Sequence, residues 1–407
     1  MRRVAITGMG GITSLGGDWG TIRQNMRQGR TGIRYMTEWD RLTDLNTRLA
    51  GPAAWFDSTK VYPRKKQRAM GRVSVLSVRS AELALEAAGL IDDPFLRSGR
   101  VGVACGSSYG STAPAVDFVK FMETGKASGL NVTSYIRMMS HTAPVNIVVF
   151  FGLTGRVVTT SSACTSGSQG IGFAFEAVRE GHADAMIAGG AEELCPTMAA
   201  VFDTLYATSL QNDAPETASR PMDRDRDGLV IGEGAAMLVV EELEHAKARG
   251  APILAEIVGF ATNADGAHIT EPQSETQAAV MRGSLQQAGL TPDVIDFVSG
   301  HAAATNIGDV SESHATAEVL GNRVPFHSLK GHFGHTLGGC GSIEAWLAVE
   351  MMRKDWFAPT ANLVNVDPRC AELDYITGEG RAITAEHLMT NNFAFGGINT
   401  SIILKRV

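Results

Sequence analysis

The stretch Val157-Val-Thr-Thr-Ser-Ser-Ala-Cys164-Thr-Ser-Gly-Ser-Gln-Gly170 joins a short β-branched run to a segment with helical spacing. This pattern predicts a buried strand that turns into a helix, with Cys164 at the turn. Unpaired N–H groups and the helix dipole favour an anion at such a position, so we expect a lowered pKa for the thiol. The small residues after the cysteine leave space for a substrate. A buried cysteine that serves as a small hydrophobic side chain fits the stretch equally well.

Short apolar runs alternate with helical patterns on both sides of this stretch. Buried strands are predicted at Val4–Thr7, Val101–Ala104, Val157–Thr160, Ala185–Ala188 and Ala235–Glu241. Helices are predicted at Ser74–Ala88 and Gly167–Arg179. Such alternation is typical of an α/β fold in which helices cover the sheets.

The pattern restarts in the second part of the chain. The charged stretch Glu241–Gly250 ends at Gly250-Ala251-Pro252, which indicates a boundary. Beyond it we expect strands at Ala255–Gly259, Ile295–Ser299, Val324–Ser328 and Thr400–Lys405, and helices at Glu275–Ala288 and Gly341–Met352. The sequence therefore predicts two similar β-α-β halves, residues 1–250 and residues 251–407.

Composition narrows the class of protein. The 407 residues are 44% hydrophobic and 19% charged, with a formal net charge of −7. This charge argues against nucleic acid or an anionic membrane as the main partner. No apolar run approaches the roughly 20 residues that a membrane helix needs. The five cysteines (Cys105, Cys164, Cys195, Cys340 and Cys370) have no disulfide framework or CxxC metal spacing, so we expect a reducing cytoplasm.

Two histidines lie in similar settings in the second half. His301 follows a predicted strand, and His335 lies in the glycine-rich segment Lys330-Gly-His-Phe-Gly-His335-Thr-Leu-Gly-Gly-Cys-Gly-Ser-Ile-Glu344. A phosphate-binding loop is improbable here because the GxxxxGK[ST] and GxGxxG patterns are absent. A metal site would need an acidic ligand beside His332 and His335. For either histidine alone, a structural role remains the commoner interpretation.

Six segments along the chain carry a resemblance to a known family. The cysteine stretch resembles the nucleophile motif of β-ketoacyl-acyl-carrier-protein synthases, His301 falls in a segment similar to their second motif, and Lys330–Glu344 resembles the third. Val4–Gly10, Arg220–Gly234 and the terminal loop Asn392-Phe-Ala-Phe-Gly-Gly-Ile-Asn399 are similar to further family segments. The resemblance spans the chain and is closest to the elongating synthases of dissociated fatty-acid or polyketide and polyene systems. It implies a thiolase-like fold with layers in the order αβαβα.

The resemblance also implies a reaction and roles for single residues. Cys164 would hold an acyl group as a thioester, and His301 and His335 would assist decarboxylation of malonyl-carrier, with no metal and no organic cofactor. Two preorganised N–H donors of this kind are worth on the order of 3–4 kcal/mol each. The backbone N–H groups of Cys164 and Phe395 would form an oxyanion hole. Lys330 and Glu344 would act by electrostatics and by ordering the His335 loop. Substrate contacts are implied for Tyr109, Thr305, Phe395 and Gly396.

Several residues depart from the family pattern. Ala303 replaces a hydroxyl residue that contacts the pantetheine arm, a loss of roughly 1 kcal/mol if nothing compensates. Ala394 replaces the first glycine of the terminal loop. Tyr109 stands where a small aliphatic residue usually lines the acyl pocket, which suggests a polar, aryl or polyenoyl primer unless the ring merely packs. The choice of acyl chain and of pathway stays open.

Partners follow from the same resemblance. Arg64, Lys65, Lys66 and Arg68 form a basic cluster that aligns with the family's docking surface for the acidic acyl carrier protein, although a plain solvated face would look the same. Gln211 replaces a basic residue that family members often carry elsewhere on this surface. We expect a homodimer, or a heterodimer with a related ketosynthase-like subunit. The alternatives are a non-catalytic partner that sets chain length and a degradative thiolase, which would need a second cysteine in the terminal loop.

Overall fold

A mixed sheet of eleven strands runs through the computed structural model, which describes residues 1–407. Its hydrogen-bonded order is β12-β11-β10-β13-β14-β9-β1-β8-β6-β4-β5. The strands of the first half are β1 (Val4–Ile12), β4 (Val101–Gly106), β5 (Val157–Thr159), β6 (Ala185–Glu192) and β8 (Gly234–Glu242). Those of the second half are β9 (Ala255–Ala264), β10 (Phe297–Ser299), β11 (Pro325–His327), β12 (Asp374–Tyr375), β13 (His387–Phe393) and β14 (Ile398–Lys405).

The two halves repeat one strand pattern. The order β1-β8-β6-β4-β5 in the first half corresponds to β9-β14-β13-β10-β11 in the second. In both, the first three strands pair antiparallel with one another, and the last two strand pairs are parallel. Three residue pairs between β1 and β9, from Val4 opposite Ile257 to Ile6 opposite Ala255, join the halves into one sheet. The division between residues 250 and 251 stays a prediction.

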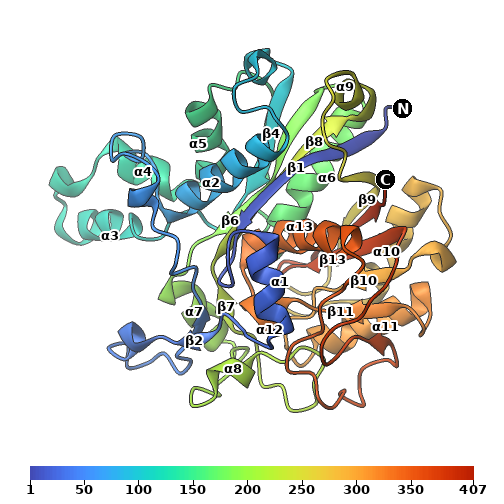
Figure 1. Cartoon of the computed structure of the whole chain (residues 1–407). Coiled ribbons are helices and arrows are strands. Elements are labelled where there is room, and N and C mark those ends of the chain that lie inside the picture. The colour runs from blue at the N-terminus through green and yellow to red at the C-terminus, as the bar shows by residue number, and fades with distance from the viewer.

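Helices lie on both outer faces and between the halves (Figure 1). On the first half, α2 (Arg72–Ala87) and α5 (Thr142–Phe151) pack outside, and α10 (Ser274–Ala288) and α11 (Gly308–Leu320) do so on the second. Between them lie α6 (Ser166–Arg179) and α13 (Cys340–Arg353), which contact each other and strands of both halves. This confirms the expected α/β class with its αβαβα layers.

Small residues let the two central helices approach closely. A Cβ atom added to Gly167 of α6 would lie 2.9 Å from the Ser342 nitrogen of α13, and one on Gly341 would lie 2.9 Å from the Ser168 nitrogen. On the sheet side, a Cβ on Gly170 would lie 2.6 Å from the Ala104 carbonyl oxygen. Backbone atoms cannot move aside as a flexible side chain can, so these positions require glycine.

The remaining elements lie around the large sheet and the helices packed on it. The helices are α1 (Trp19–Arg27), α3 (Ala115–Thr124), α4 (Val132–Met138), α7 (Pro196–Asp203), α8 (Pro215–Ala218), α9 (Leu243–Ala248) and α12 (Lys330–Phe333). The 3₁₀ turns are η1 (Thr37–Trp39), η2 (Ser58–Lys60), η3 (Pro94–Arg97), η4 (Ala127–Gly129), η5 (Ala163–Thr165), η6 (Pro292–Val294) and η7 (Leu337–Gly339). A small sheet holds β2 (Arg34–Tyr35), β3 (Leu49–Gly51) and β7 (Ile231–Gly232). In Figure 1, α3 and α4 project from the first half.

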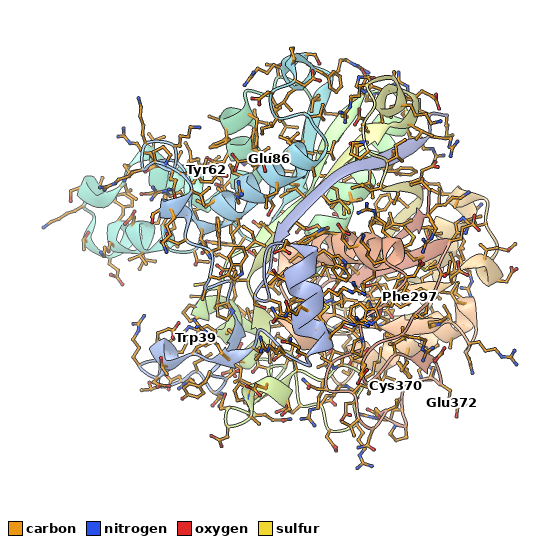
Figure 2. All side chains as sticks on the ribbon, viewed as in Figure 1. Trp39, Tyr62, Glu86, Phe297, Cys370 and Glu372 are labelled. Atoms are coloured by element: carbon orange, nitrogen blue, oxygen red, sulfur yellow. The ribbon has the colours of Figure 1, made fainter.

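The core follows this layering. The largest hydrophobic cluster joins residues of α6 and α13 to residues of strands from both halves. Phe297 of β10 belongs to it and is fully buried, whereas Glu372 lies at the surface of the same half (Figure 2). None of the helices is long and apolar enough to cross a lipid bilayer.

One expectation needs correction. The run Val157–Thr160 was predicted to be a buried strand, but β5 is the last strand of the sheet and Val157 is 45% exposed. A strand paired on one side only leaves its outer edge open. The charged stretch Glu241–Gly250, which ends at the predicted boundary, contains α9 and the buried carboxylate of Glu241, which accepts hydrogen bonds from Arg249 at 2.6 Å.

The contact of Gly170 with the sheet gives a test of the packing. We expect Gly170→Ala to lower the free energy of unfolding by about 1–3 kcal/mol, because the methyl group meets a backbone oxygen in a filled core. Gly129→Ala is the matched control, since no atom lies within 4 Å of the added methyl group. Urea unfolding of both variants measures the difference. Equal stability of the two variants would contradict the close approach of α6 to the sheet.

Candidate active site

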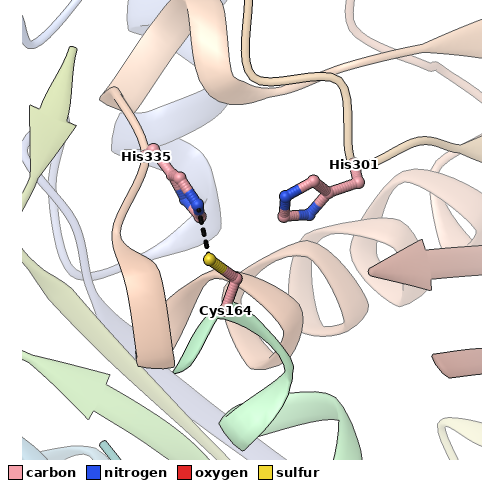
Figure 3. A group of neighbouring side chains, drawn as sticks. All are labelled: Cys164, His301 and His335. Atoms are coloured by element: carbon pink, nitrogen blue, oxygen red, sulfur yellow. Dashed lines mark hydrogen bonds between the residues drawn. The ribbon is translucent and has the colours of Figure 1, made fainter. Parts of the chain in front are cut away.

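The sulfur of Cys164 and the imidazoles of His301 and His335 converge on one pocket (Figure 3). His335 Nε2 lies 3.0 Å from Cys164 Sγ, and the two imidazole rings stand 5.1 Å apart at 85°. One ligand atom from each of the three residues lies within 4.8 Å of the others. The first half thus supplies the thiol and the second half supplies both histidines.

Cys164 lies in a strained turn at the start of α6. The preceding Ala163 has φ 51°, in the left-handed region that disfavours a side chain. The Cys340 thiol donates to the Cys164 carbonyl oxygen at 3.2 Å and holds this turn against α13. The backbone N–H groups of Phe395 and of Cys164 itself are near enough to the sulfur to lower the pKa of the thiol. Two such donors could also bind an oxyanion that forms beside the sulfur.

The predicted lowering of the thiol pKa is wrong for this resting pocket. Burial raises the pKa of Cys164 to about 11, although the Lys330 ammonium and the two backbone N–H groups act in the opposite direction. Removal of the sulfur from water therefore outweighs the helix start on which the sequence argument rested. Cys164 is a neutral thiol at neutral pH.

His301 is held by its backbone and by its ring. The Glu312 carboxylate on α11 accepts from the backbone N–H groups of His301 and Ala302 at 2.7 and 2.6 Å, which fixes the loop after β10. His301 Nδ1 lies 3.2 Å from Lys330 Nζ and 3.3 Å from Asn392 Nδ2. Both of these groups are donors, so Nδ1 accepts and the proton resides on Nε2.

A buried ion pair stands behind His301. Lys330 Nζ lies 2.5 Å from a carboxylate oxygen of Glu344, and Asn392 donates to the other oxygen at 2.6 Å. Burial opposes charge on both partners, yet the Glu344 carboxylate raises the pKa of Lys330 above its ordinary value. We expected this pair to act by electrostatics and to order the His335 loop, and that role stays a prediction. The structure adds a direct side-chain contact of Lys330 with His301.

Both histidines are neutral. Burial, joined by the nearby Lys330 ammonium, lowers the pKa of His301 and of His335 well below the ordinary histidine value. The backbone of His335 is fixed by its N–H, which donates to the Val230 carbonyl at 2.6 Å, and by its carbonyl, which accepts from Gly232 at 2.9 Å. Neutral imidazoles can donate N–H groups into the pocket without adding charge to it.

The same three side chains have a donor set that could bind zinc, but the surroundings fit a metal poorly. Coordination through His301 Nε2 would require the proton on Nδ1. Nδ1 faces two donors, Lys330 and Asn392, and cannot carry a proton without losing both contacts. The Lys330 ammonium would in addition repel a cation.

A cavity of about 310 Å³ leads from the surface to these side chains. Thr305, Phe395 and Gly397 line it, whereas Gly396 does not and donates its N–H to the Ile269 carbonyl at 2.8 Å. The substrate contacts expected of Thr305, Phe395 and Gly396 stay predictions. Tyr109 is 45% exposed and does not line this cavity, so its place in an acyl pocket stays a prediction.

Several supporting residues escaped the sequence analysis. Arg226 donates to the carbonyl oxygens of Thr305 and Asn306 at 3.0 Å and so fixes this side of the cavity. Glu192 accepts from the backbone N–H groups of Ser108 and Gly338. The segment that contains Asn392 was noticed for its glycines, whereas nothing in the spacing of Glu312 or Glu192 pointed to His301 or Cys164.

The basic cluster Arg64, Lys65, Lys66 and Arg68 lies on an exposed turn just before α2. Lys66 Nζ stands 4.8 Å from the Phe150 ring centre, and the Arg68 carbonyl accepts from Arg137 at 2.6 Å. None of the four lines the cavity to Cys164. The cluster is a separate surface feature, and its proposed docking role stays a prediction.

Comparison with known proteins agrees with this architecture. The N-terminal domain of the β-ketoacyl synthase family matches residues 1–246, and the C-terminal domain matches residues 254–364. The 3-oxoacyl-acyl-carrier-protein synthase 2 of Synechocystis is 36% identical over 411 residues, which cover 100% of this chain and 98% of the relative.

Solved structures extend the comparison to three dimensions. A β-ketoacyl synthase from Burkholderia phymatum is 54% identical and has a TM-score of 0.98, with 100% of both chains covered. A ketosynthase bound to its hexaketide and in complex with a type II polyketide acyl carrier protein is 28% identical with a TM-score of 0.88, over 100% of this chain and 99% of that one. The thiolase-like fold implied by the sequence is thereby confirmed, and the chain belongs to the β-ketoacyl synthase family of acyltransferase-type condensing enzymes.

Proposed function

We propose that this chain is a β-ketoacyl-acyl-carrier-protein synthase that carries out a decarboxylative Claisen condensation. The observation that carries the proposal is the contact between Cys164 Sγ and His335 Nε2 at 3.0 Å, with His301 on the other side of the same pocket. A nucleophile and two neutral N–H donors are what the two half-reactions require.

In the first half-reaction the sulfur of Cys164 attacks the carbonyl carbon of an acyl-carrier thioester. The carbon–sulfur bond to the carrier breaks, the acyl group stays on Cys164, and the thiol proton ends on the departing carrier thiol. The N–H groups of Cys164 and Phe395 stabilise the oxyanion formed on the way.

In the second half-reaction malonyl-carrier enters the same cavity. The bond to its free carboxylate breaks, carbon dioxide leaves, and negative charge gathers on the thioester oxygen. Nε2–H of His301, and of His335 in the same tautomer, donate to that oxygen. The enolate carbon then attacks the acyl carbonyl, and Cys164 leaves as a thiolate that takes up one proton from water. The chain thereby grows by two carbons.

Lys330 and Glu344 act behind this step without touching the substrate. The pair keeps Nδ1 of His301 an acceptor, which keeps the proton on Nε2 where the enolate forms. We assign the two residues to positioning and electrostatics, and proton transfer to neither.

The acyl carrier protein is the proposed partner in both half-reactions. One structural relative was solved as a ketosynthase in complex with an acyl carrier protein. We propose that the basic cluster Arg64, Lys65, Lys66 and Arg68 attracts the acidic carrier toward this enzyme. Five free cysteines fit a reducing compartment, and we propose a cytoplasmic location.

A second copy of the chain, or a related ketosynthase-like subunit, is proposed to cover the edge of the first half. β5 leaves one edge of the sheet unpaired, and α3 has no buried residue in the single chain. Exposed apolar side chains gather on the elements of this region: Val116, Val119, Met122, Val132, Tyr135, Val149 and Val157. A dimer through this face would pair the strand and cover the apolar side chains.

Replacing single pocket residues should affect acyl loading and condensation differently. With a panel of acyl-carriers, intact mass should show one acyl group on the wild type and none on Cys164→Ala. His301→Ala should keep loading but lose roughly 100- to 1000-fold in condensation, measured as carbon dioxide release. Cys195→Ala is the control, because Cys195 is more exposed than Cys164 yet stands outside the cavity. A wild-type chain that accepts no acyl group would point to a non-catalytic partner subunit.

Alkylation of Cys164 should follow the raised pKa of its thiol. A thiol with a pKa of about 11 is protonated at neutral pH, and its thiolate fraction grows about tenfold per pH unit below that value. The iodoacetamide rate at Cys164, measured by peptide mass, should therefore keep rising from pH 7 to at least pH 9. A plateau reached below pH 8 would show that the resting sulfur is already a thiolate.

Charge reversal should reveal whether the basic cluster serves docking. We expect Lys65→Glu with Arg68→Glu to raise KM for acyl-carrier several-fold, with kcat little changed, because the exposed cluster acts on encounter. The effect should shrink at high salt, which screens exposed charges. Lys354→Glu, an exposed reversal after α13, should leave KM unchanged. Equal KM values for the double variant and this control would refute docking on the cluster.

A further inference from the structure

A buried carboxylate stands between two loops of the site. Glu192 is the last residue of β6, and its side chain has no exposed surface. One of its oxygens, Oε2, accepts from the Ser108 backbone N–H at 2.8 Å and from the Gly338 backbone N–H at 3.1 Å. Ser108 lies shortly after β4, and Gly338 lies in η7, three residues after His335. A single oxygen of the first half therefore holds the turn that follows a pocket histidine of the second half.

The carboxylate can reach this turn because Gly338 has no side chain. A Cβ atom on Gly338 would lie 2.7 Å from the Ser108 nitrogen and 3.0 Å from Glu192 Oε2. The preceding residue, Leu337, has φ 41°, in the left-handed region that a leucine rarely adopts. Such a conformation persists only where the surrounding contacts hold it. The hydrogen bond from the next N–H to Glu192 is one of these contacts.

Glu192 acts here as an acceptor and not as a charge. Its second oxygen, Oε1, is buried and has no hydrogen-bond partner. Burial raises the pKa of Glu192 to about 7, so the side chain is neutral in about half of the molecules at neutral pH. The neutral acid still has a carbonyl oxygen that accepts both N–H groups. Glu344 differs, because it lies beside the Lys330 ammonium.

The ring of His335 depends on its backbone for its position. His335 Nδ1 is buried and has no hydrogen-bond partner, whereas Nδ1 of His301 faces two donors. The remaining polar contact of the His335 ring is the one between Nε2 and Cys164 Sγ. On the side before the ring, the backbone is held by Val230 and Gly232. On the side after it, the backbone runs directly into the turn that Glu192 holds.

We propose that Glu192 is a positioning residue for His335 and acts on it through the η7 turn. The proposal rests on the proposed function, since it concerns the N–H that His335 presents to the malonyl thioester. Glu192 does not line the cavity and touches no substrate. Decarboxylation should depend on Glu192, because a donor helps only where the negative charge forms. Acyl loading should depend on it much less, because loading uses the sulfur of Cys164 and the N–H groups beside it.

The test uses two replacements that separate the reach of the side chain from its charge. Glu192→Gln keeps the length and the acceptor oxygen and resembles the neutral acid. Glu192→Asp keeps the carboxyl group, but it is one methylene shorter and leaves at least one buried N–H without an acceptor. Enzyme preloaded with an acyl group on Cys164 is mixed with malonyl-carrier, and carbon dioxide release is divided by the acyl-enzyme measured by intact mass. This rate counts only chains that are folded well enough to be acylated.

The two variants should differ in this rate. At saturating malonyl-carrier we expect Glu192→Asp to release carbon dioxide roughly 10- to 100-fold more slowly, the effect of a displaced donor. The half-saturating concentration of malonyl-carrier should change little, because Glu192 lies outside the cavity. Glu192→Gln should stay near the wild-type rate.

A neighbouring carboxylate and a second background provide the controls. Glu193 is also buried and accepts from the Thr112 N–H and hydroxyl at 2.8 and 2.9 Å, so Glu193→Asp makes the same truncation beside η7 and should keep the wild-type rate. In the background of His335→Ala, the loss from Glu192→Asp should disappear, because residues that act through one group are not additive.

Four results would overturn the proposal. They are a wild-type rate in Glu192→Asp, an equal loss in Glu192→Asp and Glu192→Gln, an equal loss with and without His335, and a Glu192→Asp chain that takes up no acyl group. A wild-type chain that neither takes up an acyl group nor releases carbon dioxide would overturn the proposed function instead.

Discussion

The close approach of α6 to α13 is the constraint on which the site depends. Cys164 immediately precedes α6, and the segment from His335 to Gly339 immediately precedes α13. Where the helices meet, a Cβ on Gly167 would contact both the Ser342 nitrogen and the Gly338 carbonyl at about 3 Å. The sulfur and the His335 ring can stand 3.0 Å apart only because no side chain separates these two helix starts. The duplicated strand pattern places the two helices back to back, and glycine sets the distance between them.

Removal from water then determines the charge state of the thiol and of the two imidazoles in the pocket. It favours the thiol form of Cys164 and the neutral form of both histidines. Lys330 keeps its charge because Glu344 lies beside it. A buried ion pair is seldom a source of net stability, since removing both charges from water is costly. Its value here is orientation, because the ammonium and Asn392 together determine which nitrogen of His301 carries the proton.

The sequence predicted the elements that carry the chemistry better than it predicted their surroundings. For strands and helices with strong periodicity, such as β8, α6 and α10, the predicted ends lie within one or two residues of the observed ones. An apolar face that repeats at a fixed period indicates the type of element and its extent. β5 was taken as buried since its β-branched run looks like any core strand, and only the sheet order shows that it lies at an edge. The contact of Glu312 with the His301 backbone depends on how α11 packs, which no local pattern encodes. The thiol pKa was wrong for a related reason: a helix start is visible in sequence, whereas the depth of burial is not.

Neutrality of the resting pocket has a consequence for the chemistry itself. Before decarboxylation the pocket would contain the malonyl thioester with its carboxylate, two uncharged imidazoles and the compensated pair behind them. When carbon dioxide leaves, the negative charge of the carboxylate moves to the enolate oxygen, and the N–H groups proposed to meet it there are already oriented by Lys330, Asn392 and the fixed His335 backbone. No reorganisation is then needed at the moment of reaction, which is the condition under which buried dipoles contribute most. The raised pKa of the thiol has the same cause. A pocket from which water is excluded strengthens the fixed dipoles that stabilise a short-lived enolate, and it also disfavours a permanent thiolate on Cys164.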